Sequence, residues 1–127
     1  MTEQRRALVV DDMAVNRLLA VKLLTKGGWT VSEADDGPAA INLLEGLGQF
    51  EVMLLDISMP QMSGQELCRI IRQRGLGGAG VKIIAYTAHA APEDIATFRA
   101  EGFDAVLAKP VSRGTLGDTL TEMGYPP

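Results

Sequence analysis

Short apolar runs alternate with longer helical segments along the chain, and this alternation limits the possible folds more than any other feature. Strands that alternate with helices are typical of a parallel sheet covered on both faces. The pattern predicts an α/β fold with a doubly wound, five-stranded parallel sheet. The expected strands are residues 7–10, 30–34, 52–56, 81–86 and 105–108.

Four of these strands stop at a residue with ionic or hydroxyl chemistry. Asp11 follows the first strand and Asp56 ends the third, while Thr87 and Lys109 follow the fourth and fifth. In open α/β sheets, ligands bind in the crevice outside the carboxyl ends of the strands. We therefore expect these four side chains to meet in one cleft.

Each intervening segment has helical spacing or an end signal. The first helix is expected to end at Gly27-Gly28, and its apolar residues at helical spacing are Val15, Leu18, Leu19 and Leu23. The other helices are expected to start at Asp36-Gly37-Pro38, after the capping-box spacing Ser63-x-x-Glu66, at Pro92 and near residue 112. Residues 75–80 include four glycines and are expected to form a flexible connector without structure of its own.

Composition limits the class of protein. A length of 127 residues with 46% hydrophobic content fits one globular domain over residues 1–127, with a core at about 6–123. No apolar stretch approaches the roughly 18 to 20 residues that span a bilayer. The single cysteine, Cys68, indicates a reducing, cytoplasmic compartment, and a net charge of −4 without a basic cluster argues against direct nucleic-acid binding.

The acids at the strand ends predict a metal site. Asp11, Asp12 and Asp56 would lie within a few ångströms of one another, and like charges that close need a cation to offset them. Carboxylates suit a hard ion such as Mg²⁺ (or Mn²⁺), and the absence of a Cys/His grouping argues against zinc. Lys109 is the nearby protein cation.

The remaining strand-end groups suit an anionic oxygen. Thr87 supplies a hydroxyl, and Ala88 supplies a backbone N–H beside a small side chain. A carboxylate nucleophile with a divalent metal, a lysine and a hydroxyl forms a set for phosphoryl transfer. We infer that the reaction is formation of an aspartyl phosphate.

These motifs resemble the receiver domain of two-component response regulators over nearly all of the chain. The residues that carry the resemblance are Asp11-Asp12, Asp56-x-x-Met59-Pro60-x-Met62-x-Gly64, Thr87-Ala88 and Lys109-Pro110. The resemblance implies the flavodoxin-like (βα)5 fold with strand order 2-1-3-4-5 and a cis bond at Lys109-Pro110.

The resemblance also implies roles for individual residues. Asp56 resembles the phosphoacceptor and Asp11 and Asp12 the metal-binding acids, to which Ser58 adds a backbone carbonyl. Thr87 and Lys109 resemble the phosphate-sensing pair. Such a domain is a signalling phosphoacceptor that catalyses its own phosphorylation and dephosphorylation, and is not an enzyme in the usual sense.

The implied partner is a histidine kinase or histidine phosphotransfer protein, which donates phosphate from a histidine. The Asn16-Arg17 pair and Leu107-Ala108-Lys109-Pro110-Val111 are similar to receivers of hybrid sensor kinases and phosphorelays. The family docks such partners on the first helix or on the face formed by the fourth helix, fifth strand and fifth helix. In this family the latter face can also form a weak homodimer. No membrane partner is expected.

Three positions depart from the usual pattern or vary within it. Val106 stands where many receivers have Tyr or Phe, and Tyr86 is expected to point to the sheet face opposite Thr87. We therefore expect a switch at Thr87 to act through the loops near the fourth helix more than through Val106. Ser58 and His89 either tune phosphate lifetime or are ordinary exposed loop residues.

Three other interpretations of the sequence compete with a phosphorylated receiver. A receiver-like interaction module that works without phosphorylation would be favoured by loss of an acid, Asp56 or Lys109, and none is lost. A haloacid-dehalogenase-type phosphatase needs Asp-x-Asp after its first strand, whereas Asp11 and Asp12 are adjacent. An FMN carrier needs a Ser/Thr-rich loop, which residues 13–16 do not provide.

Overall fold

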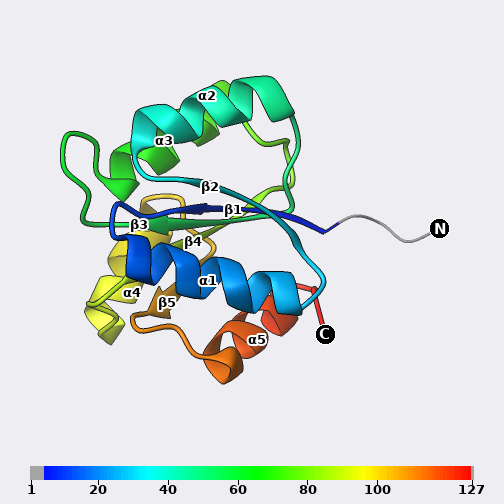
Figure 1. Ribbon diagram of the computed structural model, residues 1–127. Coiled ribbons are helices and arrows are strands. Elements are labelled where there is room, and N and C mark those ends of the chain that lie inside the picture. Colours follow the sequence, from blue (N-terminus) through cyan, green and yellow to red (C-terminus); the bar gives the residue numbers. More distant parts are fainter. Residues whose placement is uncertain (1–4, 127) are drawn as a thin grey trace.

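The protein is described by a computed structural model covering residues 5–126 (Figure 1). Five strands and five helices alternate strictly along the chain. They are β1 (Arg6–Val10), α1 (Ala14–Lys26), β2 (Thr30–Ala34), α2 (Gly37–Leu47), β3 (Val52–Asp56), α3 (Gly64–Arg74), β4 (Lys82–Thr87), α4 (Pro92–Ala100), β5 (Ala105–Ala108) and α5 (Arg113–Glu122).

The strands form one parallel sheet in the order β2-β1-β3-β4-β5, which confirms the predicted fold class and strand order. The register brings the carboxyl ends together. Val10 pairs with Leu55, Asp56 with Tyr86, and Thr87 with Ala108. The residues that end or follow these strands therefore lie along one edge of the sheet.

The core is divided by the sheet into two clusters. The first core contains residues of α2, α3 and α4, including Leu44, Leu67 and Phe98. The second core contains residues of α1 and α5, including Leu24 and Leu116. In Figure 1, α2 and α3 lie above the sheet and α1 and α5 below it. The central strand β3 is buried along its whole length because helices cover both of its faces.

The predicted helix starts are confirmed by their caps. The Asp36 carboxylate accepts a hydrogen bond from the Ala39 N–H, and the Ser63 hydroxyl accepts one from the Glu66 N–H. Side-chain oxygens at this position satisfy backbone donors of the first turn that have no partner within the helix. Both caps hold the connection between a strand and the helix that follows it.

The apolar stripe expected on α1 is only partly buried. Val15 is 77% exposed and Leu18 is 55% exposed, while Leu19 and Leu23 are half-buried against the second core. The side chains that α1 buries fully are Ala20 and Leu24. Apolar residues surround this helix on most sides, so their spacing does not show which side faces the sheet.

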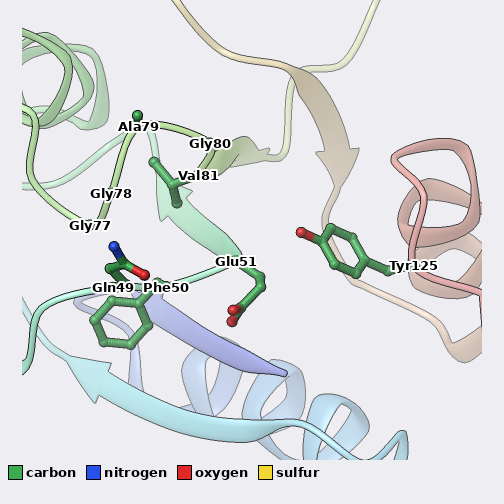
Figure 2. A pocket seen from close by; sticks show the side chains of 9 residues that line it. All are labelled: Gln49, Phe50, Glu51, Gly77, Gly78, Ala79, Gly80, Val81 and Tyr125. Atoms are coloured by element: carbon green, nitrogen blue, oxygen red, sulfur yellow. The ribbon is translucent and has the colours of Figure 1, made fainter. Parts of the chain in front are cut away.

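The glycine-rich connector is docked against its neighbours, contrary to our expectation. Gly77 forms an isolated bridge with Gln49, and its carbonyl accepts a hydrogen bond of 2.9 Å from the Phe50 N–H. Figure 2 shows this connector beside Gln49 and Phe50, where it lines a hollow of about 370 Å³. Strand β4 begins after it at Lys82, one residue later than predicted, and extends to Thr87.

Trp29 packs at the amino-terminal end of the sheet, as its position before β2 predicts. It is 5% exposed, and its ring centroid lies 5.3 Å from that of Tyr125. The Arg5 guanidinium lies 5.8 Å from the Trp29 ring and donates a hydrogen bond of 2.7 Å to the Pro126 carbonyl. The two ends of the described chain therefore meet at the pole opposite the carboxyl ends of the strands.

Cys68 is a buried, unpaired thiol in the first core, and burial raises its pKa. This agrees with a packing role. Within residues 5–126, no helix has both the length and the apolar content that crossing a bilayer requires.

Candidate functional site

Three carboxylates gather at the carboxyl edge of the sheet, as predicted. Asp11 follows β1, Asp56 ends β3, and Asp12 lies in the loop after Asp11. One oxygen of each lies within 4.8 Å of the others. Asp11 is fully buried, Asp56 is 3% exposed, and Asp12 is open to solvent. We call these three residues the acidic cluster.

Lys109 joins two members of the acidic cluster. Its Nζ lies 2.9 Å from Asp11 Oδ2 and 2.9 Å from Asp56 Oδ1. The lysine side chain is 13% exposed, so solvent screens this contact less than it screens a surface ion pair. A single ammonium therefore bridges two buried carboxylates that would otherwise repel each other.

Backbone N–H groups fix the orientation of both buried acids. The Met13 N–H donates to Asp11 Oδ1 at 2.8 Å, and the Ser58 N–H donates to Asp56 Oδ1 at 3.3 Å. Both hydrogen bonds that the Asp56 carboxylate accepts from described residues, including that from Lys109, go to Oδ1. The other oxygen, Oδ2, is therefore the one left for a ligand or a reaction.

Burial dominates the ionisation of Asp56. It raises the pKa of this carboxyl to about 6 from 3.8, and the negative charge of Asp11 adds to the rise while the hydrogen bond from Lys109 opposes it. Burial also acts to lower the pKa of Lys109, but hydrogen bonds to Asp56 and Asp11 outweigh it, and the net pKa is raised. The ammonium thus remains charged beside an acid that ionises near neutral pH.

The acidic cluster fits a hard divalent cation. Three ionised carboxylates and one ammonium leave a local charge of about −2, because the three acids outnumber the lysine by two. Asp11 Oδ2 is buried, and Lys109 Nζ at 2.9 Å is its close partner within the described residues. Such an oxygen is suited to coordinate Mg²⁺ or Mn²⁺, which prefer oxygen ligands.

The hydroxyl of Thr87 lies at the end of the neighbouring strand. Thr87 is 3% exposed, and its carbonyl accepts a hydrogen bond from the Lys109 N–H at 2.8 Å. Its Oγ1 accepts a hydrogen bond from the His89 N–H at 3.0 Å. Because Oγ1 acts as an acceptor there, the hydroxyl proton is available for donation to a ligand.

Among residues 5–126, none of the other predicted positions adds a carboxylate, thiol or imidazole ligand to the acidic cluster. Ser58, Ala88 and His89 are exposed. His89 bonds to the Thr87 hydroxyl through its backbone N–H. Val106 is half-buried and packs against the first core, whereas Tyr86 is buried in the second core. The sheet therefore separates Tyr86 from Val106.

The comparison with known families decides the identity of the domain. Residues 7–121 match the response regulator receiver domain. The chain belongs to this family. It is thus a receiver domain of the two-component signalling type, and the fold and the motifs described above agree with that membership.

The curated relatives of this receiver domain include much longer sensor kinases. The chain is 38% identical over 119 residues to the sensor histidine kinase AruS of Pseudomonas aeruginosa and 37% identical over 114 residues to the sensor histidine kinase RcsC of Escherichia coli. The alignments cover 92% and 90% of this chain but only 12% of each relative.

Solved receiver structures share the fold. The chemotaxis response regulator CheY4 of Vibrio cholerae superimposes with a TM-score of 0.86 at 28% identity, covering 95% of this chain and 99% of that one. The receiver domain of Ssk1 from Saccharomyces cerevisiae, crystallised with the histidine phosphotransfer protein Ypd1, gives 0.83 at 27% identity. That match covers 98% of this chain and 91% of the other.

Two contacts of the receiver site were not anticipated from the sequence. Arg17 donates to the Asp11 carbonyl at 2.8 Å and to Glu33 at 2.9 Å, and so ties α1 and β2 to the acidic cluster. The Tyr86 ring lies beneath Lys109, with its centroid 4.8 Å from Nζ. The Asn16-Arg17 pair is a signal for the first contact, whereas no local pattern indicates the second.

Gly64, noted as part of a motif, has a physical reason to be glycine. A Cβ at this position would collide with the Asp56 carbonyl, and the Gly64 N–H donates to the Ile57 carbonyl at 3.0 Å. The close approach folds the β3–α3 loop back onto the end of β3. This contact holds the backbone that carries Asp56.

Proposed function

We propose that Asp56 is the phosphoacceptor of this receiver domain. The observation that carries the proposal is the shared ion pair, in which Lys109 holds the buried Asp56 carboxylate beside two other acids. With a pKa of about 6, Asp56 is mostly ionised above neutral pH and can act as a nucleophile.

In the proposed reaction, Asp56 Oδ2 attacks the phosphorus of a phosphohistidine on a partner protein. A P–O bond forms, the P–N bond breaks, and its electron pair stays on the imidazole nitrogen, which takes a proton from solvent. Lys109, the Thr87 hydroxyl and the Ala88 N–H donate hydrogen bonds to the phosphoryl oxygens. These donors stabilise the charge that develops during transfer.

The proposed metal site consists of the acidic cluster and the Ser58 backbone carbonyl. Bound Mg²⁺, or Mn²⁺, would neutralise charge on the phosphoryl oxygens during transfer to Asp56 and during the later attack of water that releases inorganic phosphate. Arg17 supports this site by fixing the backbone carbonyl of Asp11. Ser58 and His89 stand exposed beside the acceptor and are proposed to control the access of hydrolytic water, and hence the lifetime of the phosphate.

The proposed donor is a histidine kinase or a histidine phosphotransfer protein. The relatives named above are sensor histidine kinases, and one structural neighbour was crystallised with a phosphotransfer protein. Helix α1, together with Met13 immediately before it, offers a docking surface beside Asp12, because Met13, Val15 and Leu18 are 56%, 77% and 55% exposed. We call these three residues the α1 apolar face. An exposed apolar cluster of this kind suits the side of a partner helix.

The proposed signal leaves through the loop between β4 and α4. Thr87 is joined to this loop by the His89 N–H, whereas Val106 offers no ring that could move into space vacated by Thr87. We propose that the domain comprises residues of about 6–123 and works in the cytoplasm, where its buried, unpaired Cys68 stays reduced.

The test is intact-mass analysis after incubation with acetyl phosphate, with Mg²⁺ or with EDTA, for the wild type beside Asp56→Asn. We expect one phosphoryl adduct that depends on Mg²⁺ and is missing from the variant. If a folded wild type gains no adduct and fails to bind beryllofluoride, the domain acts instead as an interaction module without phosphorylation.

A further inference from the structure

Tyr86 is the largest fully buried side chain of the described residues, and it lies directly beneath the site. It belongs to β4 and immediately precedes Thr87. Its side chain lies in the second core, on the sheet face opposite the first core. The backbone register places Tyr86 beside Asp56 on the neighbouring strand. A large aromatic ring therefore underlies the carboxyl edge of the sheet.

The face of this ring is the third neighbour of the Lys109 ammonium. Nζ lies 4.8 Å from the ring centroid and 2.9 Å from each of Asp11 Oδ2 and Asp56 Oδ1. The face of an aromatic ring carries negative electrostatic potential and attracts an ammonium, most strongly where water is excluded. The two carboxylates and the ring together confine the position of Nζ.

The phenol hydroxyl takes no part in this contact. It is buried and has no hydrogen-bond partner of ordinary geometry among residues 5–126. Burial raises the pKa of Tyr86 and keeps the phenol neutral, although the nearby Val111 backbone acts to lower that pKa. The ring face alone therefore interacts with Lys109. A phenylalanine would present the same face without leaving a buried hydroxyl unpaired, and this makes the role of the ring separable from that of the hydroxyl.

We propose that the face of the Tyr86 ring positions the Lys109 ammonium for phosphoryl transfer to Asp56. This inference rests on the proposed function of Asp56. When the carboxylate becomes an acyl phosphate, the charge facing Lys109 is redistributed, and one of its two ion-pair partners changes. The contact with the ring does not change, so it keeps Nζ within reach of the phosphoryl oxygens. Tyr86 is thus a positioning residue that acts through Lys109.

If the Tyr86 ring served only to pack the core, a different result would be expected from the one expected if it positions Lys109. If the ring only fills space, its replacement lowers stability to the same extent as other cavities in the second core, and the chemistry at Asp56 is unaffected in the folded fraction. If the ring positions Lys109, loss of the aromatic face slows transfer even in fully folded protein. The comparison between an aromatic and a non-aromatic replacement separates the two roles.

The test compares Tyr86→Phe, Tyr86→Met and the control Leu24→Ala, which opens a cavity elsewhere in the second core. We measure the rate of adduct formation from acetyl phosphate with Mg²⁺, at a temperature where circular dichroism shows each variant folded. NMR spectra report the ring-current shift of the Lys109 protons next to Nζ. Tyr86→Leu replaces Tyr86→Met if the methionine variant does not fold.

We expect Tyr86→Phe and Leu24→Ala to keep the wild-type rate and the upfield shift of the Lys109 protons. Tyr86→Met should lose the shift and react about tenfold more slowly, as loss of a desolvated cation–π contact predicts. Equal rates for Tyr86→Met and wild type, or an equal loss of rate in Tyr86→Phe or Leu24→Ala, would overturn the inference alone. No adduct on the wild type would overturn the proposed function and this inference with it.

Discussion

At the scale of single residues, opposing interactions set the pKa of the Asp56 carboxyl group. Its burial and its acidic neighbours favour the protonated form, while Lys109 favours the ionised form. The result is a pKa of about 6 in the folded state, against 3.8 for an aspartate in an unfolded chain. The folded domain without metal therefore binds this proton more tightly than the unfolded chain does.

This difference predicts that stability depends on pH in the absence of metal. The contribution of Asp56 is fully present below pH 3.8 and is lost as the pH rises through about 6. In EDTA, the free energy of unfolding of Asp56→Asn should exceed that of the wild type by up to about 3 kcal/mol at pH 7.5, and the gap should shrink towards pH 4.5. Urea unfolding across this range measures it.

The control for this prediction is Asp118→Asn, which removes an exposed acid from α5. As a substitution at an exposed position, it should change the free energy of unfolding by less than about 0.5 kcal/mol. Excess Mg²⁺ should also reduce the gap at pH 7.5, since the cation stabilises the ionised cluster of the wild type more than that of the variant. A gap that is flat with pH would show that Asp56 titrates normally.

At the scale of secondary-structure elements, α1 carries a surface for partner binding that is distinct from the acidic cluster, where the chemistry is proposed to occur. The α1 apolar face is exposed, while the opposite side of the helix packs into the second core through Ala20 and Leu24. Exposed substitutions on a helix usually change stability by less than about 0.5 kcal/mol. Changes on this face should therefore affect partner binding alone.

We predict that Val15→Glu lowers the rate of phosphotransfer from a histidine phosphotransfer protein by at least about tenfold, because a charge is then buried against the partner's apolar side chains. The donor in this assay is one that phosphorylates the wild type. The rate with acetyl phosphate, which needs no docking, should stay unchanged. Both rates are measured by intact mass.

The matched control is Gln73→Glu, which adds the same charge at an exposed position of α3, on the other side of the sheet. It should leave both rates unchanged. If Val15→Glu slowed the reaction with acetyl phosphate to the same degree, its effect would be on the acidic cluster and not on docking. An unaltered phosphotransfer rate would exclude the α1 apolar face as the docking surface.

At the scale of the whole molecule, the acidic cluster and Trp29 lie at opposite poles of the sheet. The five residues of β1 between them span about 16 Å at the usual strand rise. Trp29 is the only tryptophan and is nearly fully buried. We predict that Mg²⁺ with beryllofluoride leaves its emission spectrum unchanged, while urea unfolding shifts the spectrum to longer wavelength.

Moving the tryptophan provides the positive control for this measurement. In Trp29→Phe/Ala90→Trp, the single tryptophan lies in the loop between β4 and α4, through which the signal is proposed to leave. Its emission should respond to beryllofluoride. A reproducible response of Trp29 itself would instead mean that the change extends along the sheet to the far pole.

The sequence predicted the sheet and its reactive edge because both follow from short-range patterns. Strand alternation and the polar residue after each strand placed Asp11, Asp56, Thr87 and Lys109 correctly along one edge. Other features depend on packing between distant segments. Neither the docking of Gly77 against Gln49 nor the rotation of α1, which exposes Val15, can be read from local spacing.

The same limit applies inside the site. Strand alternation predicts that Tyr86 and Thr87 point to opposite faces, and the structure places Tyr86 in the second core. The contact of the Tyr86 ring with Lys109 depends on where the side chain of a residue that follows β5 lies relative to β4. Likewise, the bond from Arg17 to the Asp11 carbonyl depends on the angle at which α1 leaves the sheet. Side-chain direction in three dimensions decides both.

The hydrogen bond between Arg5 and the Pro126 carbonyl has a consequence for how the domain can be combined with others. Arg5 and Pro126, the ends of the described residues, meet at one pole of the sheet. Such a domain suits insertion into a surface loop of a host protein, because the two sides of the opened loop would stay close together. Inserted in this way, it would present Asp12 and the α1 apolar face outwards. A freely diffusing partner could then reach them without contacting the host.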